Sequence, residues 1–149
     1  MLLAGDVGGT STRLGLFSPG EARPALLQTR SYATSAFGDL RQMLAVFLEE
    51  TGTAIERLAG AAFGVAGPVV GSRIRLTNVD WWIEPADLAR ALGLRHVILL
   101  NDLAAMAHAI PVLAADEIVT LQAGSVDPRG NVALVAPGCQ ITFANVGFW

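Results

Sequence analysis

The 149-residue sequence contains no lysine, and its ten basic residues are all arginine. A P-loop needs a lysine on the nucleotide phosphates, and the protein-kinase fold needs one on its third strand, so both classes are excluded. The net charge of −3 and the scattered arginines provide no basic stripe. Nucleic acid is therefore not an expected partner.

Cysteine and histidine are also scarce. Cys139 is the single cysteine, which excludes disulfides and zinc sites of the CxxC type. The two histidines, His96 and His108, do not stand at metal-ligand spacing from a second ligand. We expect both to be structural or surface residues.

Long apolar runs are absent, although 52% of the residues are hydrophobic and the mean hydropathy is +0.49. The longest nearly uncharged stretch, LAGAAFGVAGPVVGS, is broken by glycines and a proline and is too short to span a bilayer. The start, MLLAGD, lacks the basic region of a signal peptide. We therefore expect a cytoplasmic protein without membrane contact.

Hydrophobic periodicity predicts an α/β lobe in which helices flank a mixed β-sheet. We expect a hairpin across Gly71-Ser72, an amphipathic helix that ends at Gly52, a helix that starts at Pro85 and ends at Gly93, and a helix that Pro111 stops. The other strands are expected at residues 2–5, 12–17, 25–32, 58–68, 96–100, 117–121 and 132–137, with a turn at 127–131.

The stretch GDVGGTSTR (residues 5–13) joins the first two predicted strands through Gly8 and Gly9. Glycines let backbone amides approach an anion closely, and a Cβ at either position should obstruct that approach or strain a backbone with positive φ. The stretch does not match GxGxxG and leads into a strand, which disfavours a Rossmann site. Asp6 beside such a cradle suits a Mg²⁺-nucleotide better than bare phosphate. The alternative is a tight glycine hairpin that binds nothing.

Two further segments carry polar groups. Asn101 and Asp102 follow the strand at 96–100, and ligands of open α/β sheets bind at the carboxyl ends of strands. Alternatively, these residues cap the helix that starts there. In LTNVDWW (residues 76–82), Asn78 could hydrogen-bond a polyol and an exposed tryptophan could stack on a sugar. The alternative is a turn with two buried indoles.

Together these segments resemble a known family. GDVGGTSTRLGLF resembles the first phosphate motif of the bacterial glucokinase family, within the actin-like/hexokinase ATPase superfamily. VAGPV, LTNVDW and ILLNDLAAMAHAIPVL follow in the order of that family, so the resemblance covers about residues 2–138. It implies a ribonuclease-H-like lobe and ATP-dependent transfer of phosphate to the 6-hydroxyl of glucose.

The resemblance also implies roles for individual residues. Asp102 is the implied catalytic base, Asn101 and Asn78 are implied sugar ligands, and Asp6 is implied to lie near Mg²⁺, through water. The residues implied to hold the ATP phosphates are Gly5, Asp6, Val7, Gly8, Gly9, Thr10 and Arg13. A sugar hydroxyl is too weak an acid to ionise in advance. The carboxylate therefore orients it and accepts its proton late, while positioning and charge neutralisation supply most of the catalysis.

The sequence departs from the family pattern at two places. Ser11 stands where the family usually has asparagine. After Gly138 the family continues with Thr-Gly-Leu-Gly, a second phosphate loop, and then a second lobe, whereas this chain reads CQITFANVGFW. We therefore expect an N-terminal lobe at residues 1–138 and an atypical tail at 139–149, with the second lobe missing. The alternative function is a non-catalytic remnant that binds sugar weakly or associates with itself, for example as a homodimer.

Overall fold

The computed structural model describes residues 1–70, 73–76, 78–125 and 134–135. The chain divides into two compact units, Met1–Asp102 and Leu103–Trp149, and each is described by itself below.

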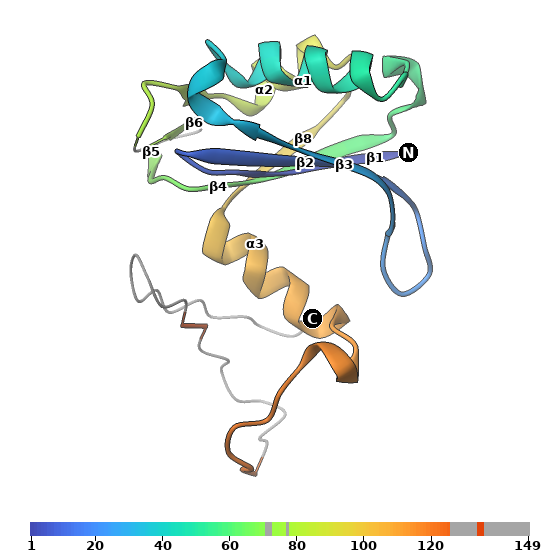
Figure 1. Ribbon diagram of the computed structural model, residues 1–149, viewed down its shortest axis with the longest axis vertical. Helices are drawn as coiled ribbons and strands as arrows, with labels where there is room; N and C mark the ends of the chain where they lie inside the picture. Colours follow the sequence, from blue (N-terminus) through green and yellow to red (C-terminus); the bar gives the residue numbers. More distant parts are fainter. Residues whose placement is uncertain (71–72, 77, 126–133, 136–149) are drawn as a thin grey trace. The chain divides into compact units, whose positions relative to one another are not determined.

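The first unit is built on a mixed sheet of five strands in the order β3-β2-β1-β4-β8 (Figure 1). β1 pairs antiparallel with β2, which pairs antiparallel with β3, whereas β1, β4 and β8 run parallel to one another. The strands are β1 (Leu2–Val7), β2 (Ser11–Ser18), β3 (Ala25–Ala33), β4 (Gly60–Val65) and β8 (Val97–Asn101). This arrangement confirms the mixed sheet that the sequence predicts.

The helices α1 (Leu40–Glu50) and α2 (Pro85–Ala91) cover one face of this sheet (Figure 1). The core lies between the two layers, and burying each large apolar side chain there contributes about 1.5–3 kcal/mol. Its largest fully buried apolar side chains are Leu3, Val7, Leu14, Leu16, Met43, Leu44, Phe47, Phe63, Val65 and Leu76. In the described part of this unit no helix lies on the opposite face of the sheet.

The ends of α1 follow the sequence signals. Asp39 is the N-cap and accepts a hydrogen bond from the Gln42 amide (2.8 Å). Burial opposes ionisation of Asp39, but this hydrogen bond and the Arg41 guanidinium together lower the pKa of its carboxyl below the ordinary value. After the helix, Gly52 adopts a φ of 61°, which confirms it as the stop. Gly93 (φ 60°) ends α2 in the same way.

A smaller antiparallel sheet has the order β5-β6-β7, with β5 (Val69–Val70), β6 (Arg73–Arg75) and β7 (Trp82–Ile83). The β5–β6 pairing confirms the predicted hairpin, whose turn at residues 71–72 lies outside the described residues. β7 is not predictable from the sequence, because a strand of two residues is too short to show a period of two.

In the second unit, α3 continues from Asp102 to Ala109 and passes into a 3-10 turn, Ile110–Val112, at Pro111, as predicted. The strand predicted at 117–121 is wrong. Residues Ala115–Glu117 form a 3-10 turn instead, and Val119 and Leu121 are 81% and 96% exposed. A short apolar run becomes a strand only beside a partner strand, and none in the described part of the chain pairs with it.

Of the strand predicted at 132–137, only residues 134 and 135 are described, and neither lies in a strand. The predicted turn at 127–131 and the tail at 139–149 lie outside the described residues. Among the residues that are described, no helix is long and apolar enough to cross a membrane.

Candidate active site

The candidate site residues gather at one edge of the five-stranded sheet, where the three parallel strands end. The register pairs Val7 of β1 with Val65 of β4, and Val65 with Asn101 of β8. Neighbouring strands lie about 4.8 Å apart, so the backbones of Val7 and Asn101 are separated by roughly 10 Å. The loop after β1 and the β8–α3 junction therefore lie on the edge where α/β sheets bind their ligands.

The loop after β1, Gly8–Thr10, is called the glycine loop below. The Gly8 amide donates to the Ser11 carbonyl (3.1 Å), which closes the turn into β2. The Thr34 amide donates to the Thr10 carbonyl (3.0 Å), and the Thr34 hydroxyl donates to the Gly8 carbonyl (2.7 Å). Within the described part of the chain, the amides of Gly9 and Thr10 donate to no acceptor. Two successive open amides are a suitable site for a phosphate oxygen.

Both glycines of this loop are required by close packing. A Cβ on Gly8 would lie 2.7 Å from the Ser11 carbonyl oxygen, and a Cβ on Gly9 would lie 2.7 Å from the Cβ of Asn78. Neither glycine has a positive φ, so the positive-φ strain considered from the sequence is wrong at both positions. The close approach of neighbouring atoms is the reason that only glycine fits.

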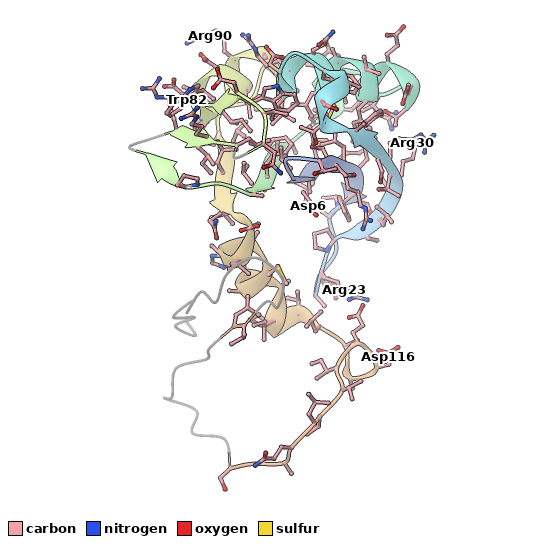
Figure 2. All side chains as sticks on the ribbon, turned by 60° about the vertical axis from the view of Figure 1, so that its left-hand side comes forward. Asp6, Arg23, Arg30, Trp82, Arg90 and Asp116 are labelled. Atoms are coloured by element: carbon pink, nitrogen blue, oxygen red, sulfur yellow. The ribbon has the colours of Figure 1, made fainter. Side chains whose placement is uncertain are left out.

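The remaining predicted phosphate residues divide between the two faces of the sheet. Gly5 and Val7 face the core: a Cβ on Gly5 would meet Phe63 at 2.7 Å, and Val7 is fully buried. Any side chain at position 5 or 7 therefore points into the core and away from a ligand. Asp6 and Arg13 stand opposite each other in the β1–β2 register, and both are exposed. Figure 2 shows Asp6 projecting from the sheet on the side away from α1.

At the end of β8, Asn101 is partly buried, and its side-chain amide donates to the Gly67 carbonyl after β4 (3.4 Å). Asp102, also partly buried, is the first residue of α3. A carboxylate in a first helical turn is favoured by the helix dipole. This placement fits a role in stabilising the start of the helix as well as catalysis, and both roles stay predictions.

The small sheet brings Asn78 to the glycine loop. Asn78 is exposed between β6 and β7, and its side chain is the nearest neighbour of Gly9. A predicted sugar ligand and a predicted phosphate residue are therefore adjacent, although they are far apart in the sequence.

The two neighbouring indoles differ in their surroundings. Trp81 is buried (6% exposed), but Trp82 is 47% exposed, so the turn with two buried indoles is wrong for Trp82. Trp82 lies in β7 next to the buried Ile83, and alternation along the strand turns it outward (Figure 2). The guanidiniums of Arg73 and Arg75 lie over its ring, 4.9 and 5.7 Å from the centroid.

Two residues that organise the site, Gly67 and Thr34, were not predicted from the sequence. Gly67 accepts the hydrogen bond from Asn101, and a Cβ on it would collide with the Arg75 carbonyl oxygen, so only glycine lets β6 approach here. The Gly67-Pro68 pair signalled a turn but not this approach. Thr34 binds the glycine loop from the end of β3, and no local pattern marks it, because its partners lie more than twenty residues away.

No group of three histidine, cysteine or carboxylate side chains in the described residues could hold a metal ion. This leaves Asp6 as a single exposed carboxylate near the glycine loop. Mg²⁺ that travels with a nucleotide needs only one or two protein carboxylates beside phosphate and water, so Asp6 with the open amides fits a Mg²⁺-nucleotide.

Known proteins resemble this chain in sequence and in fold. The chain is 40% identical over 144 residues to the glucokinase of Synechocystis sp. and 38% identical over 136 residues to that of Aromatoleum aromaticum; each match covers 91% of this chain. It spans only about 40% of the length of these relatives. The crystal structure of a glucokinase from an Antarctic psychrotroph superposes with a TM-score of 0.77 at 26% identity, over 87% of this chain and 41% of that one. This likeness confirms the actin-like ATPase fold. The glucokinase family model matches residues 3–145, and the chain belongs to the glucokinase family.

Proposed function

We propose that this chain supplies the phosphate loop, the base and part of the sugar site of an enzyme that phosphorylates glucose with ATP and Mg²⁺. One observation carries the proposal: in a chain of the glucokinase family, the register of β1, β4 and β8 brings the glycine loop to the same end of the sheet as Asn101 and Asp102, and Asn78 lies against Gly9. We assign residues 1–138 to this lobe and 139–149 to an atypical tail. We expect it to act in the cytoplasm, where ATP is available.

The glycine loop is suited to bind the β- and γ-phosphates of ATP. Its open Gly9 and Thr10 amides donate to phosphate oxygens, and Arg13 on the adjoining strand adds positive charge. Asp6, opposite Arg13 in the register, would hold Mg²⁺ through water. When bound, Mg²⁺ neutralises charge on the transferred phosphoryl group. Backbone amides and the metal thus replace the lysine that the sequence lacks.

The sugar is held between the glycine loop, which Asn78 adjoins, and the end of β8. The side-chain amides of Asn78 and Asn101 bind glucose hydroxyls, and Asp102 accepts a hydrogen bond from the 6-hydroxyl. As the bond between O6 and the γ-phosphorus forms, the bond from that phosphorus to the ADP oxygen breaks, and the O6 proton passes to Asp102. Asp102 thus orients the nucleophile and receives its proton late in the step.

A second candidate function is a non-catalytic module that binds sugar weakly or pairs with a copy of itself. The sheet face away from α1 favours it, because Leu26 and Ile98 are 57% and 55% exposed and no helix of the described first unit covers that face. Exposed apolar surface of this kind promotes association.

A chimera separates the two candidates. Residues 1–138 replace the matching part of the Synechocystis glucokinase, and glucose 6-phosphate formation is followed in a coupled assay. We expect ATP- and glucose-dependent turnover, with the parent Synechocystis enzyme as the positive control. A folded chimera that binds glucose and Mg-ATP without turnover would contradict the proposal and favour the non-catalytic module.

A further inference from the structure

The hydrogen bonds of the glycine loop converge on one residue, Thr34, which begins a 3-10 turn (Thr34–Ala36) after β3. Its amide and its hydroxyl donate to the carbonyls of Thr10 and Gly8, at 3.0 and 2.7 Å. The Ser11 carbonyl accepts from the Gly8 amide. The carbonyl oxygens of Gly8, Thr10 and Ser11 are therefore all engaged within the protein.

A second hydroxyl stands behind Thr34. The Oγ1 atoms of Thr12 and Thr34 are 2.9 Å apart, and both residues are fully buried at 0% exposure. A hydroxyl has one proton to donate. Because Thr34 gives its proton to the Gly8 carbonyl, the proton between the two hydroxyls comes from Thr12. The buried hydrogen bonds thus run in one direction, from Thr12 to Thr34 to Gly8.

This direction decides which groups the loop presents. With the Gly8 and Thr10 carbonyl oxygens held by Thr34, and the Ser11 carbonyl held by the turn, the loop leaves the amides of Gly9 and Thr10 open, and these are donors. A loop with its peptide units flipped would present carbonyl oxygens, which repel an anion. Holding the peptide units in advance lowers the cost of binding a phosphate.

We propose that Thr34 is a positioning residue for nucleotide phosphates, which acts through the Gly8 and Thr10 carbonyls, and that Thr12 orients its hydroxyl. Neither side chain contacts the nucleotide. The identity of the anion, a nucleotide polyphosphate, rests on the proposed function; the positioning of the loop rests on the hydrogen bonds alone.

The test compares four variants of chain 1–149: Thr34→Val, Thr34→Ser, Thr12→Val and, as a matched control, Thr29→Val. Thr29 donates its hydroxyl to the Leu14 carbonyl (3.1 Å) in the same sheet but does not contact the loop. Amide NMR signals of Gly9 and Thr10 are recorded without ligand and during titrations with Mg-ATP and with glucose.

We expect Thr34→Val to shift both amide signals and to weaken Mg-ATP binding about 10-fold, the equivalent of one lost hydrogen bond. Thr12→Val should weaken it by roughly 3-fold, because Thr34 still donates to Gly8. Thr34→Ser keeps the hydroxyl and should bind Mg-ATP like the wild type, as should Thr29→Val. Glucose binding should stay within about 2-fold in every variant.

Unchanged amide signals and unchanged Mg-ATP affinity in Thr34→Val would overturn the inference, and so would a larger loss in Thr12→Val than in Thr34→Val. If Thr34→Val does not fold, Thr12→Val and Thr34→Ser decide, since only the former should lose affinity. If Mg-ATP shifts no loop signal either in the wild-type chain or in the chimera, the proposed nucleotide function fails. The ligand-free amide signals of the variants still test whether Thr34 positions the glycine loop.

Discussion

Replacing Gly8 with alanine tests whether the glycine loop is a phosphate cradle. The new Cβ would lie 2.7 Å from the Ser11 carbonyl oxygen, whereas ordinary contact begins at 3.4 Å. The obstacle is backbone, and the same oxygen accepts the Gly8 amide at 3.1 Å, so relieving the contact opens the turn. Overpacking costs about 1–3 kcal/mol, and a weakened hydrogen bond adds about 1 kcal/mol.

If about 2 kcal/mol of this cost destabilises the loop conformation that binds phosphate, the dissociation constant for Mg-ATP rises roughly 30-fold. The chimera described above provides the assay: KM for ATP and for glucose, with the melting temperature as a check on folding. The glucose KM should change little, because the new Cβ at position 8 meets only Ser11 and not the side chain of Asn78. Gly60→Ala is the matched control, since its Cβ would make an ordinary contact of 3.8 Å with Leu2 at the opposite edge of the sheet.

Gly9→Ala should behave differently, because its Cβ would displace the Asn78 side chain. We expect both KM values to rise in that variant. A Gly8→Ala chimera that is folded and has the wild-type KM for ATP would refute the phosphate cradle. An equal loss of both ligands in Gly8→Ala would indicate general unfolding of the loop.

Three further results are expected. Asp102→Asn in the chimera keeps the size and the capping capacity of the side chain but removes the base, so kcat should fall by roughly 100-fold or more at an unchanged melting temperature. Near-normal turnover would contradict the catalytic assignment of Asp102, and unfolding of the variant would favour the capping role. Chain 1–149 alone should release no ADP in response to glucose, because phosphoryl transfer needs both substrates held in line. The same chain should self-associate, as measured by light scattering. An active, monodisperse monomer would contradict both expectations. Asp39→Ala should lower the free energy of unfolding by about 1 kcal/mol near neutral pH. Because the folded pKa of Asp39 is lowered, this contribution is complete above the unfolded pKa of about 3.9 and disappears as the pH falls through the folded value. Urea unfolding at several pH values measures it, and a pH-independent difference would rule out the charge as its source.

The elements that the sequence predicted well are those whose signals are local. The five apolar residues from Leu40 to Leu48 that face one side of a helix are all buried, and Gly52 ends α1 with a positive φ. Residues 97–100 of HVILL lie in the parallel strand β8, which ends at Asn101, because β-branched and apolar residues in an uninterrupted run suit a position beside another strand. Local periodicity and end signals therefore determined most of the sheet and its covering helices.

The site was predicted less completely, because its geometry depends on contacts between distant residues. The motif residues indicated Asn78 and the glycines separately, but only the fold shows that Asn78 lies against Gly9. Thr34 has no recognisable motif, since its role comes from hydrogen bonds to a loop on another strand. The apolar run at 117–121 shows the opposite error: its composition favours a strand, but the described chain offers it no partner.

The position of β1 in the sheet has a consequence for folding during synthesis. β1 is synthesised before both of its neighbours: β2 follows it directly, but β4, in which Gly60 pairs with Leu2, follows only after β3 and α1. Chain synthesis proceeds at about 5–20 residues per second, so the apolar edge of β1 that pairs with β4 stays without its native partner for several seconds. Nascent chains that contain only β1, β2 and β3 should therefore bind chaperones. This binding should end once β4 has emerged from the ribosome.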